Sequence, residues 1–340
     1  MFVLLGLDQA IVRLKIKLDE IFGLAHVQFF LLSAIVVGFL SMFEMNIDYL
    51  SAFFTLFFLA LAYILFAYYR LNMHYILAQI FIQGWKIVLL FLLLTFGFYN
   101  FEIAMPLSIA LIVLLLGFSH YKRFSIYQPS LNNYKKYLIT GLHYFFSMLT
   151  LTLSLYADQL LLNYDKRTEE SSILFTHITF FVSPIAIILG FAGFVIGPYL
   201  KNNPEKKRVF FHRFFPLYLL LGLGLAVFSY FLGSALIRYL KDEATLQPFL
   251  ALALSGVVFL RYLYIFPSAY IGSFAPNSLI RQVSFVNLIG IVAYVTLYFI
   301  VSRMTNDYLL SITLSILFVW ILRILNGYYA IWLIFQNDYE

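Results

Sequence analysis

Cysteine is absent from the 340-residue chain, which excludes disulfide bonds and thiol chemistry. Charged residues are also scarce, at 11% of the sequence, whereas soluble domains carry about 25%. The motifs of phosphate-binding loops (GxxxxGK(S/T)), zinc proteases (HExxH) and serine hydrolases (GxSxG) do not occur in it. We therefore expect neither a large soluble domain nor an enzyme, and ATP-driven transport would need a separate subunit.

Hydrophobic residues make up 63% of the chain and aromatic residues 20%. Apolar runs of about 20 residues, long enough to cross a bilayer, recur along the sequence. We predict an all-α, polytopic transmembrane helix bundle with ten full spans, at residues 27–43, 49–69, 75–98, 103–119, 137–162, 173–200, 214–237, 248–271, 282–302 and 308–335. Asp48 and Asp307 are expected to cap the second and the last span. Residues 1–20 add a partial, amphipathic helix.

Basic residues in the loops predict the orientation of these spans. One set of alternate loops holds only Lys166, Arg167, Arg238, Lys241 and Arg303. The other set holds Arg13, Lys15, Lys17, Arg70, Lys122, Arg123, Lys135, Lys136, Lys201, Lys206, Lys207, Arg208, Arg213 and Arg281. The richer set is cytoplasmic by the positive-inside rule. Residues 120–136 are then a basic cytoplasmic linker between a first lobe, 1–119, and a six-span second lobe, 137–340.

Four predicted spans carry polar side chains at helical spacing, which lipid cannot satisfy. These stripes are Gln79, Gln83 and Lys86; Thr140, His143, Ser147, Thr150, Ser154 and Asp158; Ser284, Asn287, Tyr294 and Tyr298; and Ser311, Ser315, Arg323 and Asn326. Each stripe is expected to face protein or a water-filled cavity. Hydrogen bonding between helices, without a transport role, is the alternative interpretation.

Three cations lie inside the predicted spans: Lys86, Arg261 and Arg323. A charge at the bilayer centre costs about 2.5–3.5 kcal/mol, so each needs a partner. An anionic substrate such as a diphosphate would supply one, since a guanidinium binds its oxygens bidentately. The alternatives are an ion pair, for example between Arg261 and Asp158, or snorkelling of Arg323 to a helix end.

The sixth span is punctuated by glycine and proline. Pro184 and Pro198 flank three glycines, at positions 190, 193 and 197. Small residues permit close helix packing, and proline bends a helix. We therefore expect either tight packing or a kink in this span.

Two motifs carry a family resemblance. The fifth span ends in Asp-Gln-Leu-Leu-Leu-Asn-Tyr at residues 158–164, followed by Phe175-Thr176. Residues 6–14 read Gly-Leu-Asp-Gln-Ala-Ile-Val-Arg-Leu. Both segments resemble signatures of bacterial polysaccharide repeat-unit flippases (Wzx-type), within the multidrug/oligosaccharidyl-lipid/polysaccharide exporter superfamily. That family usually has Arg at the position of Gln159 and often Gly at that of Asn163.

The resemblance implies a transporter of the bacterial cytoplasmic (inner) membrane. Its substrate would be an undecaprenyl-diphosphate-linked oligosaccharide repeat unit, flipped by alternating access for surface polysaccharide such as O-antigen or capsule. Lys86, Arg261, Arg323, Gln83 and Asn287 are then candidate substrate-binding residues, and Asp158 serves coupling or charge balance. The other expected partners are membrane lipid and polysaccharide assembly proteins. We expect a monomer without metal, cofactor or nucleic acid, and an amino-terminal part missing relative to the family.

Two other functions stay open at this point. A membrane-embedded polysaccharide polymerase or acyltransferase should present a long outer loop with catalytic charges, whereas the predicted outer loops are short. A multidrug exporter would favour acidic residues for cationic drugs, whereas this chain places more cations than acids inside its spans.

The basic asymmetry predicts the sidedness of two loops. Reporter fusions after Asn202 and after Lys166 are expected to report opposite sides of the membrane, with Asn202 in the cytoplasm. Alkaline phosphatase and green fluorescent protein fusions, made at both positions, measure this. Both positions on one side would refute the topology.

Overall fold

The computed structural model describes residues 3–16, 22–42, 48–95, 101–124, 131–241 and 246–336. Within these ranges every regular element is a helix, which confirms the all-α class. Nine of the described helical segments are long and apolar enough to cross a membrane, and the shorter apolar helix Phe101–Leu116 falls on the remaining predicted span, 103–119. The protein is therefore a multi-pass helical membrane protein.

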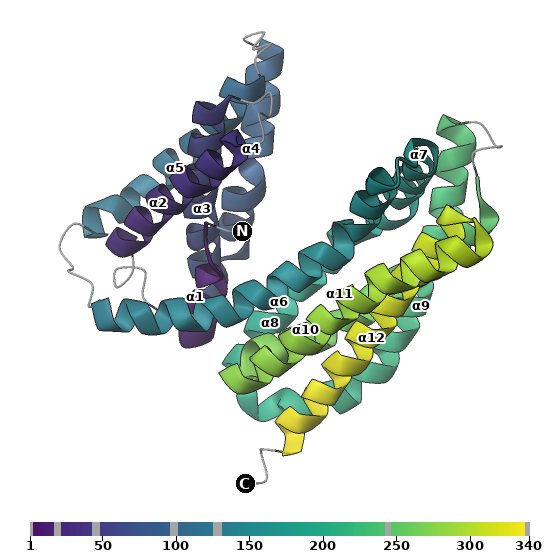
Figure 1. Cartoon of the computed structure of the whole chain (residues 1–340). Helices are drawn as coiled ribbons and strands as arrows, with labels where there is room; N and C mark the ends of the chain where they lie inside the picture. The colour runs from purple at the N-terminus through teal and green to yellow at the C-terminus, as the bar shows by residue number, and fades with distance from the viewer. Residues whose placement is uncertain are drawn as a thin grey trace. The chain divides into compact units, whose positions relative to one another are not determined.

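The helices follow one another with short connections (Figure 1). In chain order they are α1 (Leu7–Leu14), α2 (Phe22–Ser41), α3 (Tyr49–Leu71), α4 (Tyr75–Thr95), α5 (Phe101–Phe124), α6 (Leu131–Tyr164), α7 (Thr168–His177), the π-helical η2 (Ile178–Val182), α8 (Ser183–Asn202), the 3-10 helix η3 (Pro204–Lys206), α9 (Lys207–Leu240), α10 (Pro248–Phe274), α11 (Asn277–Thr305) and α12 (Tyr308–Gln336).

Both predicted caps are confirmed. The Asp48 carboxylate accepts a hydrogen bond from the amide of Leu50 at 3.1 Å, and that of Asp307 accepts one from Leu310 at 2.9 Å. Each acceptor satisfies an amide of the first helical turn that has no partner within the helix. An aspartate before each helix therefore marks its start, because its carboxylate forms this local hydrogen bond.

Both ends of the predicted linker 120–136 belong to helices. α5 continues to Phe124 and α6 begins at Leu131, whereas residues 125–130, including Pro129, lie outside the described residues. Polar residues do not by themselves end a helix, because helix hydrogen bonds join backbone groups that every non-proline residue carries. Two compact units, Met1–Phe145 and Phe146–Glu340, divide within α6 rather than in this linker.

The first unit is built around α3, which packs against α1, α2, α4 and α5. Leu7 and Ile11 of α1 are fully buried, whereas Leu14 at its end is exposed. Gly6, at φ 74°, approaches the backbone of Gly141 so closely that a Cβ atom there would lie 2.1 Å from the Gly141 carbonyl oxygen. The pair therefore lets the amino-terminal segment rest directly on the backbone of α6.

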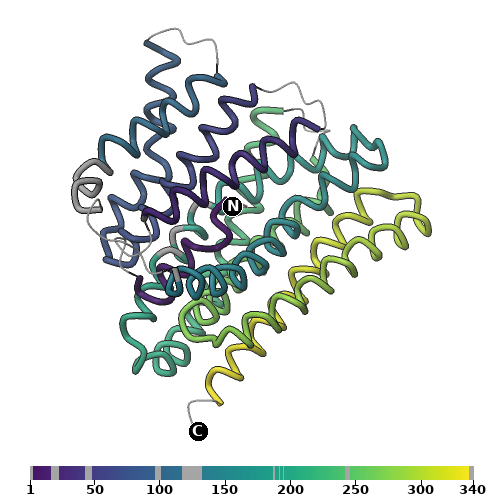
Figure 2. The backbone as a smooth tube through the Cα atoms, turned by 60° about the vertical axis from the view of Figure 1, so that its left-hand side comes forward, coloured from purple at the N-terminus to yellow at the C-terminus, as the bar shows by residue number. Residues whose placement is uncertain are grey.

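The second unit is built around α10, the most buried of the candidate spans. α10 packs against α7, η2, α8, α9 and α12, and α11 packs mainly against α12. Figure 2 shows these helices running beside one another within the unit. α6 buries the apolar side chains of Leu161 and Leu162 in this unit, and its Thr150 accepts a hydrogen bond from Arg323 of α12.

The sixth span contains a helix irregularity just before Pro184. The turn Ile178–Val182 is π-helical, and proline cannot donate a backbone hydrogen bond to the turn before it. Side-chain hydroxyls bond to carbonyls of this turn: Ser183 donates to Ile178 at 3.3 Å, and Ser229 of α9 donates to Phe181 at 2.6 Å. The irregularity in this span is thus a widened turn in which the carbonyls of Ile178 and Phe181 accept hydrogen bonds from serine hydroxyls.

This packing makes Gly233 of α9 intolerant of a side chain. A Cβ atom at Gly233 would lie 2.6 Å from the ring of Phe181, whereas one at Gly224 of the same helix meets nothing within 4 Å. We predict that Gly233→Ala lowers stability by about 1–3 kcal/mol through overpacking. Gly224→Ala serves as the matched control, and thermal unfolding in one detergent compares the two. Equal melting temperatures would contradict the assigned contact.

Candidate functional site

Arg323 is buried in the interior of the second unit. It lies near the middle of α12, its side chain is 2% exposed, and Nη2 donates a hydrogen bond to Oγ1 of Thr150 on α6 at 3.1 Å. The guanidinium carbon lies 5.4 Å from the ring centroid of Tyr264 and 5.8 Å from that of Trp320. The alternative of snorkelling to a helix end is therefore wrong, because the side chain is held by contacts within the bundle.

Arg261 of α10 shares an aromatic partner with Arg323. Its guanidinium carbon lies 5.6 Å from the ring centroid of Trp320, so two cations lie against one indole. A cation above an aromatic face gains about 2 kcal/mol when it is desolvated. Such contacts offset part of the burial penalty but leave both positive charges in place.

Asp158 is the acidic member of this group. It lies on α6, is 4% exposed, and accepts a hydrogen bond from the amide of Gln159 at 2.8 Å. Asp158 and Arg261 interact electrostatically. The ion pair considered from the sequence is not formed within 4.0 Å between these two described side chains. Asp158 thus offsets the charge of Arg261 from a distance and does not bind it directly.

Asn287 of α11 is also buried and is linked to α12. Its Oδ1 accepts a hydrogen bond from Nδ2 of Asn326 at 3.0 Å, and Asn326 lies one helical turn beyond Arg323. Two buried donors, Nδ2 of Asn287 and Nε of Arg323, have no hydrogen-bond partner among the described residues. Buried donors without acceptors are costly, so each of these donors favours a hydrogen-bond acceptor.

Lys86 and Gln83 lie on α4 in the other unit, and both side chains are exposed. The Lys86 ammonium lies 5.8 Å from the ring centroid of Trp85. The α4 stripe therefore differs from the stripes of α6, α11 and α12, whose residues in the second unit are mostly buried. The substrate-binding role of Lys86 and Gln83 stays a prediction.

The sequence analysis missed the aromatic residues of this site. Tyr264 and Trp320 each lie three residues from an arginine on their own helix, Arg261 and Arg323. Residues three apart share a helix face, so this spacing of cation and aromatic ring was a usable signal. Because aromatic residues make up 20% of the chain, such pairs are hard to tell from chance spacing.

We call Asp158, Arg261, Trp320 and Arg323, with Tyr264, the cationic cluster of the second unit. It contains two guanidinium groups and one carboxylate, which leaves an excess of positive charge; Arg323 and Asp158 are buried, and Arg261 is half-buried. Guanidinium groups bind phosphate and carboxylate oxygens bidentately. The cluster can therefore attract an anion into the apolar part of the bundle.

No protein-family model matches this chain, and no significantly similar curated protein or solved structure is found. The resemblance seen in residues 6–14 and 158–164 therefore stays an expectation.

The contact between Arg323 and Thr150 predicts a stability difference. Thr150→Val keeps the shape of the side chain but removes the acceptor, and we expect a loss of about 1–3 kcal/mol because a buried guanidinium donor becomes unsatisfied. Thr152→Val on the same helix is the control, since Thr152 bonds to the Met148 carbonyl of its own helix. Thermal unfolding in detergent measures both, and equal losses would contradict a specific role of Thr150.

Proposed function

We propose that this protein is a membrane transporter that flips lipid-linked oligosaccharide units across a bilayer, with the diphosphate linkage bound by Arg261 and Arg323. The observation that carries the proposal is the pair of guanidinium groups, Arg261 and Arg323, against the single ring of Trp320. A diphosphate supplies the negative charge and the acceptor oxygens that this arrangement lacks. The resemblance to polysaccharide repeat-unit flippases points to the same substrate class, with undecaprenyl as the lipid.

Asp158 gives the proposed transporter a way to respond to its substrate. Its carboxylate interacts electrostatically with Arg261. A bound diphosphate competes for the same cation, so substrate changes the interactions between α6 and α10. A ligand shifts a conformational equilibrium only through such a difference in interaction between states. Alternating access driven by this exchange is the proposed mechanism, in a bacterial inner membrane.

The sign of the buried charge favours this function over its alternatives. A multidrug exporter for cationic drugs is better served by acidic residues, whereas the cationic cluster has more guanidinium groups than carboxylates. For a polymerase or acyltransferase we identify no group of side chains arranged as a nucleophile with its base in the cluster. Polysaccharide assembly proteins remain the expected protein partners.

The proposal predicts that removing either arginine slows transport. Purified protein is reconstituted in liposomes with a fluorescent undecaprenyl-diphosphate oligosaccharide, and dithionite quenching measures movement between leaflets. Arg261→Gln and Arg323→Gln are expected to slow it at least about tenfold, because a charge-assisted hydrogen bond contributes about 1.5–3 kcal/mol. Lys86→Ala is tested in the same way.

Arg281→Gln is the matched control, because Arg281 is an exposed arginine of α11 outside the cationic cluster. Protein abundance in the liposomes is measured for every variant. Wild-type rates in both cluster variants would overturn the proposal. Transport of a fluorescent organic cation, with no movement of the lipid, would favour the multidrug exporter instead.

A further inference from the structure

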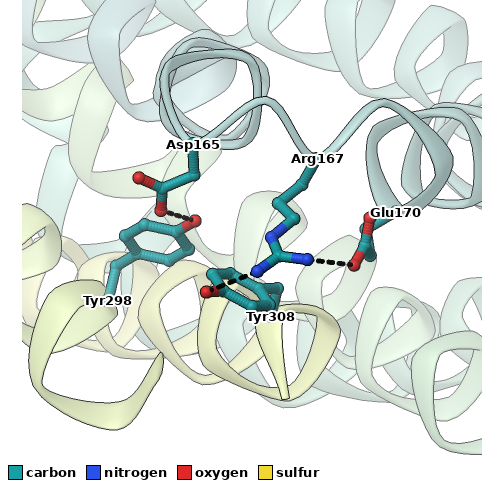
Figure 3. A network of polar contacts seen from close by, with 5 residues as sticks. All are labelled: Asp165, Arg167, Glu170, Tyr298 and Tyr308. Carbon is teal, nitrogen blue, oxygen red and sulfur yellow. Dashed lines mark hydrogen bonds and ion pairs between the residues drawn. The ribbon is translucent and has the colours of Figure 1, made fainter. Parts of the chain in front are cut away.

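A second group of polar residues lies at the end of the second unit where α6 meets α7 and α11 meets α12. Figure 3 shows that the hydroxyl of Tyr298 points at the carboxylate of Asp165, to which it donates a hydrogen bond at 2.6 Å. Arg167 donates to the hydroxyl of Tyr308 at 2.8 Å and lies 4.0 Å from the carboxylate of Glu170. These contacts tie the α6–α7 turn to α11 and α12.

The same contacts fix two side chains that line a cavity. The guanidinium carbon of Arg167 lies 3.9 Å from the ring centroid of Tyr308, so this ring is held by stacking as well as by its hydroxyl. Tyr298 is fully buried, and its hydrogen bond orients the Asp165 carboxylate. The cavity beside them has a volume of about 490 Å³, in the range of ligand pockets in proteins.

Aromatic rings and polar side chains line this cavity together. Its aromatic residues are Tyr164, Phe299 and Tyr308. Its polar residues are Asp165, Ser302, Arg303 and Asn306. The carboxylate of Asp165 accepts hydrogen bonds, the guanidinium of Arg303 donates them, and the hydroxyl of Ser302 and the amide of Asn306 can do both.

The balance of charge restricts the ligand. Asp165 and Arg303 contribute one charge of each sign, so the lining favours neither an anion nor a cation strongly. Aromatic rings pack against apolar ring faces, whereas the polar groups pair with hydroxyls. An uncharged sugar has both features in one molecule: C–H faces and a rim of hydroxyl groups.

We propose that this cavity binds one or two neutral sugar units of a glycan. The loops at this end of the unit, after α6 and after α11, belong to the predicted outer side of the membrane. The identification of this glycan with the head group of the transported lipid rests on the proposed function. The cavity would then hold the sugar after it has crossed and before it leaves.

Saturation-transfer difference NMR tests this with purified full-length protein in detergent. The probes are the methyl glycosides of glucose, galactose and N-acetylglucosamine, with methyl glucuronide and choline as charged comparisons. We expect at least one neutral glycoside to bind at about millimolar concentration. Asp165→Asn and Ser302→Ala are expected to weaken it, Asp165→Asn by about tenfold.

Met304→Ala is the control, because Met304 is exposed beside Arg303 but does not line the cavity. Melting temperatures show that each variant is folded. The proposal is overturned if no neutral glycoside binds to the wild-type protein, if both cavity variants bind like the wild type, or if choline or the glucuronide binds better. Slow lipid movement in Arg323→Gln together with failed glycoside binding would remove this site and leave the proposed transport intact.

Discussion

The second unit depends on how it buries the guanidinium group of Arg323. A charge in the apolar interior costs several kcal/mol unless neighbouring groups replace the lost water. Thr150 accepts its hydrogen bond, and Tyr264 and Trp320 present aromatic rings to it. These partners come from α6, α10 and α12, so one buried cation links three helices that are far apart in the sequence.

Packing around α10 places the polar groups that the site uses. Where helices approach closely, as at Gly233 beside Phe181, the ring leaves no room for a side chain at the glycine, and the nearby Ser229 bonds the Phe181 carbonyl. Polar contacts also hold α6, because Arg323 reaches its Thr150 and the buried Tyr298 reaches Asp165 beyond its last turn. Polar bridges of this kind can exchange partners more readily than interlocked apolar surfaces, which suits the proposed exchange of Asp158 for a diphosphate.

Local signals in the sequence were reliable guides to the fold. Asp48 and Asp307 cap helices as expected, and described helices fall on all ten predicted spans. The linker 120–136 was harder to predict, since hydropathy reports where lipid ends and not where the helix ends. For Arg323, snorkelling was a reasonable alternative from sequence alone, because spacing along a helix does not reveal which neighbouring side chains reach a cation.

The sequence by itself determined that the chain forms long apolar helices and that polar stripes run along four of them, because both properties follow from hydropathy and from the helical period. Only the tertiary structure decided which stripes are buried, that Arg261 and Arg323 converge on Trp320, and that Asp165 and Tyr308 line one cavity. The physical reason is that periodicity fixes the face on which a side chain lies, whereas its partners depend on packing between helices distant in sequence.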